Sequence, residues 1–126
     1  SGDNLHEMVI GISPKSYVRP HRHHGKSESF HLVEGSAEIV ILSEQGEIEE
    51  VIALSPMANF YYRLDAPRYH TLLVTAPVLV IHETTNGPFD PDQTDWAPFA
   101  PVEGAPECAI YTAQLRQSVE AWKASR

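Results

Sequence analysis

Hydrophobic and polar positions alternate in short runs along the first two thirds of the chain. The runs are rich in Val, Ile, Leu, Tyr and Phe, and they are separated by Gly, Pro, Asn and Ser. Short runs of this kind between turn residues are typical of an all-β sandwich or barrel. We predict strands near residues 7–12, 16–22, 27–34, 36–43, 47–54, 59–64, 69–75 and 78–84.

The pattern changes after residue 85. Residues 86–105 are rich in proline and have no periodicity, which predicts an extended coil that Phe89, Trp96 and Phe99 hold against the barrel. We predict a C-terminal helix over residues 106–124, because apolar side chains recur there at spacings of three and four. The apolar stripe favours packing of this helix on its own barrel. A contact in a homodimer is the alternative.

Composition excludes some partners. The chain has 17 acidic and 9 basic residues and a formal net charge of −8, which argues against a nucleic-acid partner. No apolar run is long enough to span a membrane, so we expect no membrane partner. Cys108, the single cysteine, cannot form an internal disulfide and fits a reducing compartment. We expect a cytoplasmic location.

Four of the seven histidines fall between residues 21 and 31. If residues 16–23 form a strand, the alternation of side chains puts Arg19, His21 and His23 on one face. On the next strand Glu28 shares a face with apolar side chains, where a lone carboxylate is costly unless a cation neutralises it. His70 lies on a third strand, also at an inward position. These positions favour a divalent-metal site.

Another interpretation of the same residues stays open at this point. The histidines could form a polar turn, with Glu28 exposed and His70 a core residue bonded to a carbonyl. His24 and His31 alternate away from the proposed site and are expected to face outward, and His6 has no assigned partner. Arg19 could hold an anionic ligand or pair with a surface carboxylate.

The segment resembles the first motif of the cupin family. His21-Arg22-His23, four residues, Glu28, six residues and Gly35 follow that motif, and His70 stands where the second motif has its histidine. Residues 4–104, with "YVRPHRH" and "KSESFHLVEG", are similar to the small WbuC-type cupin metalloproteins, which are often encoded among bacterial O-antigen biosynthesis genes.

The resemblance implies a double-stranded β-helix, the cupin jelly-roll barrel, with an extended coil and one C-terminal helix. Residues 3–85 would form the barrel and residues 86–126 would pack on it, within a single domain. It also implies that His21, His23, Glu28 and His70 bind one metal ion. Three imidazoles and a carboxylate suit Fe, Mn, Ni, Co or Zn, and they leave coordination positions open.

Two classes of function remain. The first is a metal-dependent enzyme that acts on a small molecule such as a sugar or sugar-nucleotide in polysaccharide biosynthesis, for example an isomerase or epimerase, with an Fe(II) dioxygenase as a further alternative. The second is a non-catalytic module that binds a metal or another ligand. Tyr61 or Tyr62 and His82 are candidate acids or bases, although the sequence does not decide which way they face.

Overall fold

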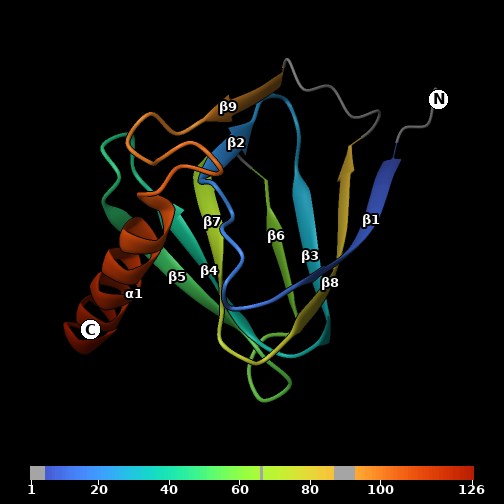
Figure 1. Cartoon of the computed structure of the whole chain (residues 1–126). Helices are drawn as coiled ribbons and strands as arrows, with labels where there is room; N and C mark the ends of the chain where they lie inside the picture. Colours follow the sequence, from blue (N-terminus) through green and yellow to red (C-terminus); the bar gives the residue numbers. More distant parts are fainter. Residues whose placement is uncertain (1–4, 66, 87–92) are drawn as a thin grey trace.

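The fold consists of two antiparallel sheets that face each other, in a computed structural model that describes residues 5–65, 67–86 and 93–126 (Figure 1). The four-stranded sheet has the order β1 (Leu5–Ile12), β8 (Leu79–Asn86), β3 (Glu28–Glu34) and β6 (Tyr61–Leu64). The five-stranded sheet has the order β5 (Ile48–Leu54), β4 (Ala37–Leu42), β7 (Tyr69–Val74), β2 (His21–His23) and β9 (Thr94–Trp96). One helix, α1 (Cys108–Ala124), follows.

The main core lies between the two sheets. Successive side chains of a strand point to opposite faces of the sheet, so the apolar residues at alternate positions enter this layer. The buried members are Phe30, Leu64, Leu79 and Ile81 from the four-stranded sheet and Ala37, Ile39, Ile41, Ile52, Leu54, Leu72 and Val74 from the other.

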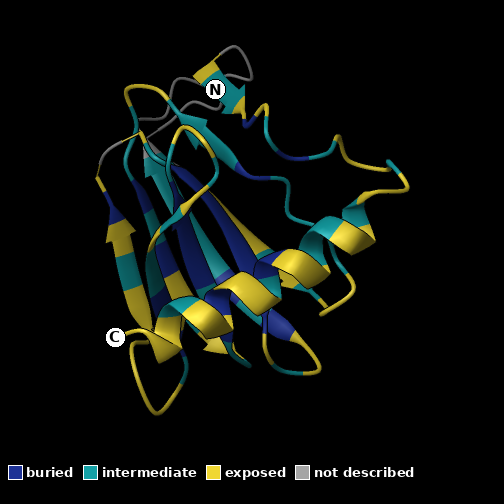
Figure 2. Ribbon diagram, turned by 90° about the vertical axis from the view of Figure 1, so that its left-hand side faces the viewer, coloured by how far each residue is buried: buried dark blue, intermediate teal, exposed yellow. Residues whose placement is uncertain are grey.

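Helix α1 covers the outer face of the five-stranded sheet. Leu115 and Val119 are buried against Val40, Leu42 and Leu73, while the opposite side of the helix is exposed (Figure 2). This second core explains why β4 is apolar on both of its faces. The helix therefore packs on its own sheet through the stripe that the sequence predicts. No helix in the described ranges is long and apolar enough to cross a membrane.

The strand predicted at residues 16–22 is wrong for most of its length, because β2 begins only at His21. Pro20 has no N–H to donate to a ladder. Two residues earlier, the carbonyl of Val18 accepts a hydrogen bond from the Thr71 hydroxyl instead of a backbone N–H. Residues 13–20 therefore reach the site as an irregular segment, and strand alternation does not govern Arg19.

The coil after the barrel contains a short strand that the sequence analysis did not predict. Strand β9 pairs with β2 and forms the edge of the five-stranded sheet. Phe99 packs edge-on against Tyr69 with ring centroids 5.6 Å apart, as expected, but Trp96 is 51% exposed. Phe89 lies outside the described residues. The helix begins at Cys108, two residues later than predicted, with Glu107 as its N-cap.

Two turns depend on glycine. Gly46 takes a positive φ of 88° in the β4–β5 hairpin. Gly35, between β3 and β4, has φ 87°, and a Cβ there would overlap the carbonyl of Val78. Both the backbone conformation and the close approach therefore require glycine at position 35.

Candidate metal centre

Strands β2 and β7 place three imidazoles on the inner face of the five-stranded sheet. His21 is paired directly with His70 in the β2–β7 ladder, so both side chains point to the same face. His23 shares that face because it lies two residues further along β2. The ring centroid of His21 is 5.0 Å from that of His23 and 4.6 Å from that of His70.

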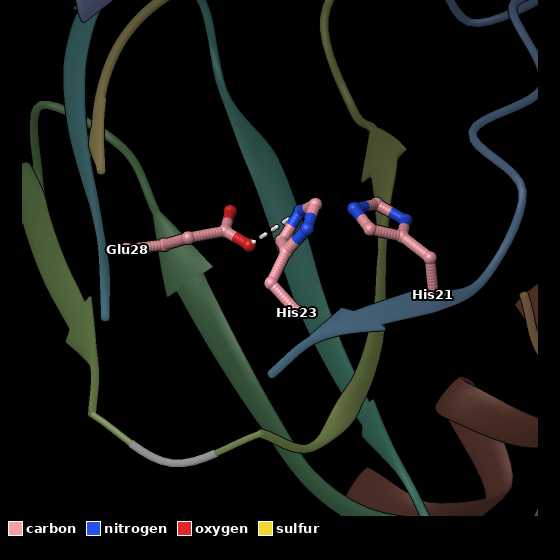
Figure 3. A group of neighbouring side chains, drawn as sticks. All are labelled: His21, His23 and Glu28. Carbon is pink, nitrogen blue, oxygen red and sulfur yellow. Dashed lines mark ion pairs between the residues drawn. The ribbon is translucent and has the colours of Figure 1, made fainter. Parts of the chain in front are cut away.

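Glu28 comes from β3 in the opposite sheet and reaches the same point (Figure 3). Its Oε1 lies 3.0 Å from His23 Nε2 and 3.5 Å from His70 Nε2. One ligand atom each from His21, His23 and Glu28 lie within 4.8 Å of one another, a group that could hold a metal ion. Three of the four predicted ligands thus form one group between the sheets, and His70 lies beside its carboxylate.

Hydrogen bonds orient the rings from behind. His21 Nδ1 donates to the Arg19 carbonyl at 2.8 Å, and His70 Nδ1 donates to the Arg68 carbonyl at 2.9 Å. His23 Nδ1 lies 2.9 Å from the hydroxyl of Thr94 on β9. Partners of this kind hold a ring in one tautomer, with Nε2 available as a ligand atom.

The carboxylate of Glu28 and the neighbouring imidazoles shift one another's pKa values. Burial alone would raise the pKa of Glu28, but the neighbouring imidazoles of His23 and His70 outweigh it and hold that pKa well below its usual range. Burial alone would lower the pKa of His70, but the Glu28 carboxylate outweighs it and raises that pKa. His21 has its pKa lowered to about 4, chiefly by burial and then by His70, so it is neutral at neutral pH.

These residues fit a divalent cation. His70 is 2% exposed, and its Nε2 has no hydrogen-bond partner among the described residues. Glu28 is 4% exposed and ionised. A buried carboxylate beside buried ring nitrogens is stabilised by a positive charge at their common point. The combination of nitrogen and oxygen donors is one that Zn²⁺ and other first-row transition ions accept.

Several other predicted residues lie outside this group. Tyr61 and His82 both pair with His31, which is exposed, so these three side chains share the outer face of the four-stranded sheet. The sequence left the orientation of Tyr61 and His82 open, and the structure places both on the outer face, away from the interior of the barrel. His24 faces outward, as predicted, and pairs with Asp95.

Tyr62 faces inward, since it pairs with the buried Phe30 and packs against the main core. Burial, and then the charge of Glu50, raises its pKa. It is thus the one inward-facing residue among the three acid–base candidates from the sequence.

The sequence analysis missed Glu83. It is paired with Phe30 in the β3–β8 ladder, so its half-buried side chain faces the space between the sheets. Burial, and then the charge of Glu28, raise its pKa to about 7. Its signal was available in the alternation of Leu79, Ile81 and Glu83 along one strand, two apolar residues followed by a carboxylate.

Comparison with known proteins gives one family match and many fold matches. A family described only as a domain of unknown function, DUF6016, matches residues 1–54. No curated protein sequence matches the chain. The fold is similar to that of a dTDP sugar isomerase from Desulfovibrio desulfuricans, with a TM-score of 0.66 and 16% identity, over 86% of this chain and 71% of that one.

Two further structures extend the comparison. A dTDP-4-dehydrorhamnose 3,5-epimerase from Elizabethkingia anophelis has a TM-score of 0.61 and 13% identity, over 75% of this chain but 56% of the epimerase. The capsular polysaccharide assembling protein CapF from Staphylococcus aureus has a TM-score of 0.60 and 20% identity, over 76% of this chain but 27% of CapF. The two facing antiparallel sheets and these neighbours confirm the predicted fold: an all-β double-stranded β-helix, or jelly roll, with one C-terminal helix.

Proposed function

We propose that this protein is a metal-dependent cupin enzyme that isomerises or epimerises a sugar or sugar-nucleotide. The observation that carries the proposal is the interior group of His21, His23 and Glu28, whose ligand atoms lie within 4.8 Å of one another. His70 Nε2 lies 3.5 Å from the same carboxylate, which supports His70 as a fourth ligand. The fold neighbours that act on dTDP-sugars support the choice of substrate class.

His21, His23, Glu28 and His70 would hold one divalent transition ion, of Fe, Mn, Ni, Co or Zn. Such an ion would polarise a sugar oxygen as a Lewis acid. His21 needs no deprotonation at neutral pH to serve as a ligand, because its pKa is about 4. The Glu28 carboxylate raises the pKa of His70, so a metal ion would compete with a proton for His70 Nε2.

Glu83 would be the proton-transfer group. Isomerisation or epimerisation next to a carbonyl removes a proton from carbon and returns one to the same or the neighbouring carbon. A carboxyl group with a pKa of about 7 can do both near neutral pH, since both of its forms are populated. A divalent ion nearby would lower this pKa and favour the carboxylate, the form that accepts the proton.

The WbuC-type assignment, a role in surface-polysaccharide synthesis and a cytoplasmic location belong to the same proposal. They are supported by the resemblance of residues 4–104 and by the fold likeness to a capsular polysaccharide assembling protein. The net charge of −8 and the single cysteine are compatible with them.

The test is a screen of sugar-nucleotides in deuterated water, with protein of measured metal content. With the metal-loaded protein, we expect deuterium to be incorporated at the sugar carbon next to a carbonyl. This incorporation should be abolished in both His70→Ala and Glu83→Gln. His31→Gln is the matched control, because His31 is an exposed histidine of β3 outside the site. Stable metal binding without exchange in any sugar-nucleotide would favour the non-catalytic module, and oxygen uptake by the Fe(II) form would favour a dioxygenase.

A further inference from the structure

Arg19 has unused hydrogen-bonding capacity beside the metal centre. Its Nε is buried and has no hydrogen-bond partner, and none of the ion pairs in the described part of the chain includes it. Arg22, three residues later, is instead fully engaged: its Nη1 lies 2.6 Å from Glu44 and its Nε lies 3.1 Å from Asp95. The chain has nearly twice as many acidic as basic residues, yet no carboxylate of residues 5–65, 67–86 or 93–126 forms an ion pair with Arg19.

Trp96 connects this arginine to the site. It is paired with His21 in the β2–β9 ladder, and its indole centroid lies 5.6 Å from the His21 ring. The Arg19 guanidinium carbon lies 5.1 Å from the same indole. Trp96 is 51% exposed. This large apolar side chain is therefore accessible to solvent at a position between His21, a candidate metal ligand, and the Arg19 guanidinium.

A purely structural role explains this arrangement poorly. An arginine that served only to hold β9 in place would pair with Asp95, the neighbour of Trp96, but that carboxylate is taken by Arg22 and His24. The planar guanidinium is suited to a carboxylate or phosphate, because it can donate two parallel hydrogen bonds to either. Its contact with the indole keeps it in a fixed orientation.

We propose that Arg19 and Trp96 form an anion-binding subsite at the edge of the metal centre. It would take the carboxylate or phosphate group of an acidic sugar, while the indole packs against the apolar face of the sugar ring. This inference rests on the proposed function, since it names the substrate class of the same site. It selects acidic sugars over neutral ones.

The experiment uses Trp122→Phe protein, in which Trp96 is the single tryptophan and therefore reports on the subsite by its fluorescence. The probes are glucuronate, glucose 6-phosphate and neutral methyl glucoside, each titrated into Zn²⁺-loaded and metal-free protein. We expect saturable changes with one or both anionic probes and none with methyl glucoside. Glucuronate binding alone would assign a carboxylate, and glucose 6-phosphate binding alone a phosphate.

Variants then locate the binding. In the same background, Arg19→Gln should raise the Kd of the anionic probe at least about tenfold, and Arg19→Lys should restore part of the affinity. Arg63→Gln is the matched control, because Arg63 is an exposed arginine of β6 that forms an ion pair with Asp65. Calorimetry with Trp96→Phe should show weaker binding of the same probe.

The outcomes separate this inference from the proposed function. Unchanged affinity in Arg19→Gln, equal binding of methyl glucoside, or no binding of either anion to protein that holds Zn²⁺ would overturn the subsite while leaving the metal centre intact. Failure to bind any of the divalent ions of Fe, Mn, Ni, Co and Zn would instead overturn the proposed function. Arg19-dependent binding of an anionic probe to that metal-free protein would still support the subsite.

Discussion

His23 Nε2 and Glu28 Oε1 lie 3.0 Å apart, and they come from strands that belong to different sheets (Figure 3). The four residues between them carry the chain from β2 across to β3, with Gly25 at a φ of 65° in the turn. A single tight connection therefore brings an imidazole and a carboxylate together across the interior. This explains why the spacing from His23 to Glu28 is so short in a site shared by two sheets.

Glu28→Gln should weaken Zn²⁺ binding by at least about tenfold, because the amide removes the negative charge that balances the ion. The measurement is a competition titration against a chelator of known affinity. Glu34→Gln, an exposed glutamate at the other end of β3, is the control and should bind Zn²⁺ as the parent does. Equal metal content in Glu28→Gln and the parent would contradict the ligand set.

Zn²⁺ affinity should fall as the pH is lowered through the raised pKa of His70. The pKa of His70 is raised in the metal-free protein, so below that pKa its proton must be displaced before Nε2 can bind an ion. His21 does not contribute in this range, because its pKa is about 4. Calorimetry in buffers of different ionisation enthalpy should count the released protons, with a smaller number in His70→Ala. A flat pH profile would contradict the assignment of His70.

Glu83→Gln should stabilise the metal-free protein at high pH but not at low pH. The folded-state pKa of Glu83 is about 7, above the unfolded value of 4.5, so the folded state retains a proton that the unfolded state releases between these values. The parent therefore loses stability as the pH rises through this window, and glutamine avoids the loss. Urea unfolding at about pH 8 should show a gain on the order of 3 kcal/mol. The same gain at about pH 4 would point to packing rather than titration.

Gly35→Ala should destabilise the fold more than Gly104→Ala. Both glycines have a φ of 87°, so the backbone cost of about 1–2 kcal/mol is shared. At position 35 the new Cβ also meets the Val78 carbonyl, while at position 104 nothing lies within 4 Å. We expect a total cost of about 3 kcal/mol or more for Gly35→Ala, measured by denaturant unfolding. Equal costs at the two positions would show that the β3–β4 turn can shift.

Leu115→Ala should cost about 2–3 kcal/mol, because this side chain is 7% exposed and packs in the second core between α1 and the five-stranded sheet. Ile110→Ala on the same helix is the control, with an expected cost below about 0.5 kcal/mol, since Ile110 is 62% exposed. The alternative function of the helix stripe, a dimer contact, predicts that Leu115→Ala also changes the oligomeric state in light scattering.

The sequence predicts strands where local signals are strong. β-branched runs bounded by turn residues locate seven of the strands to within two residues, and the apolar stripe locates the helix equally well. Strands β2 and β9 are the exceptions. Each is three residues long, and each is defined by pairing with strands far away in the sequence, β2 with β7 and β9, and β9 with β2. Neither therefore has enough local pattern to be recognised.

The same distinction applies to the site. His21, His23 and Glu28 follow one another within eight residues, and strand periodicity with one turn brings them together. The orientation of the Tyr61 and His82 side chains depends on the register of β6 and β8 against β3. A shift of one residue in that register would turn these side chains to the other face of the sheet. Glu83 and Trp96 enter the site through pairing with strands far away in the sequence.

The amino-acid sequence alone determined the all-β architecture, the C-terminal helix and the three metal-ligand candidates that lie close together in the chain, because these depend on side-chain periodicity and on neighbouring residues. The tertiary structure alone decided that His70 meets Glu28, that Glu83 faces inward, and that Arg19 lies unpaired over Trp96. These contacts join segments 40 or more residues apart, and only the pairing of whole strands across two sheets brings such segments together.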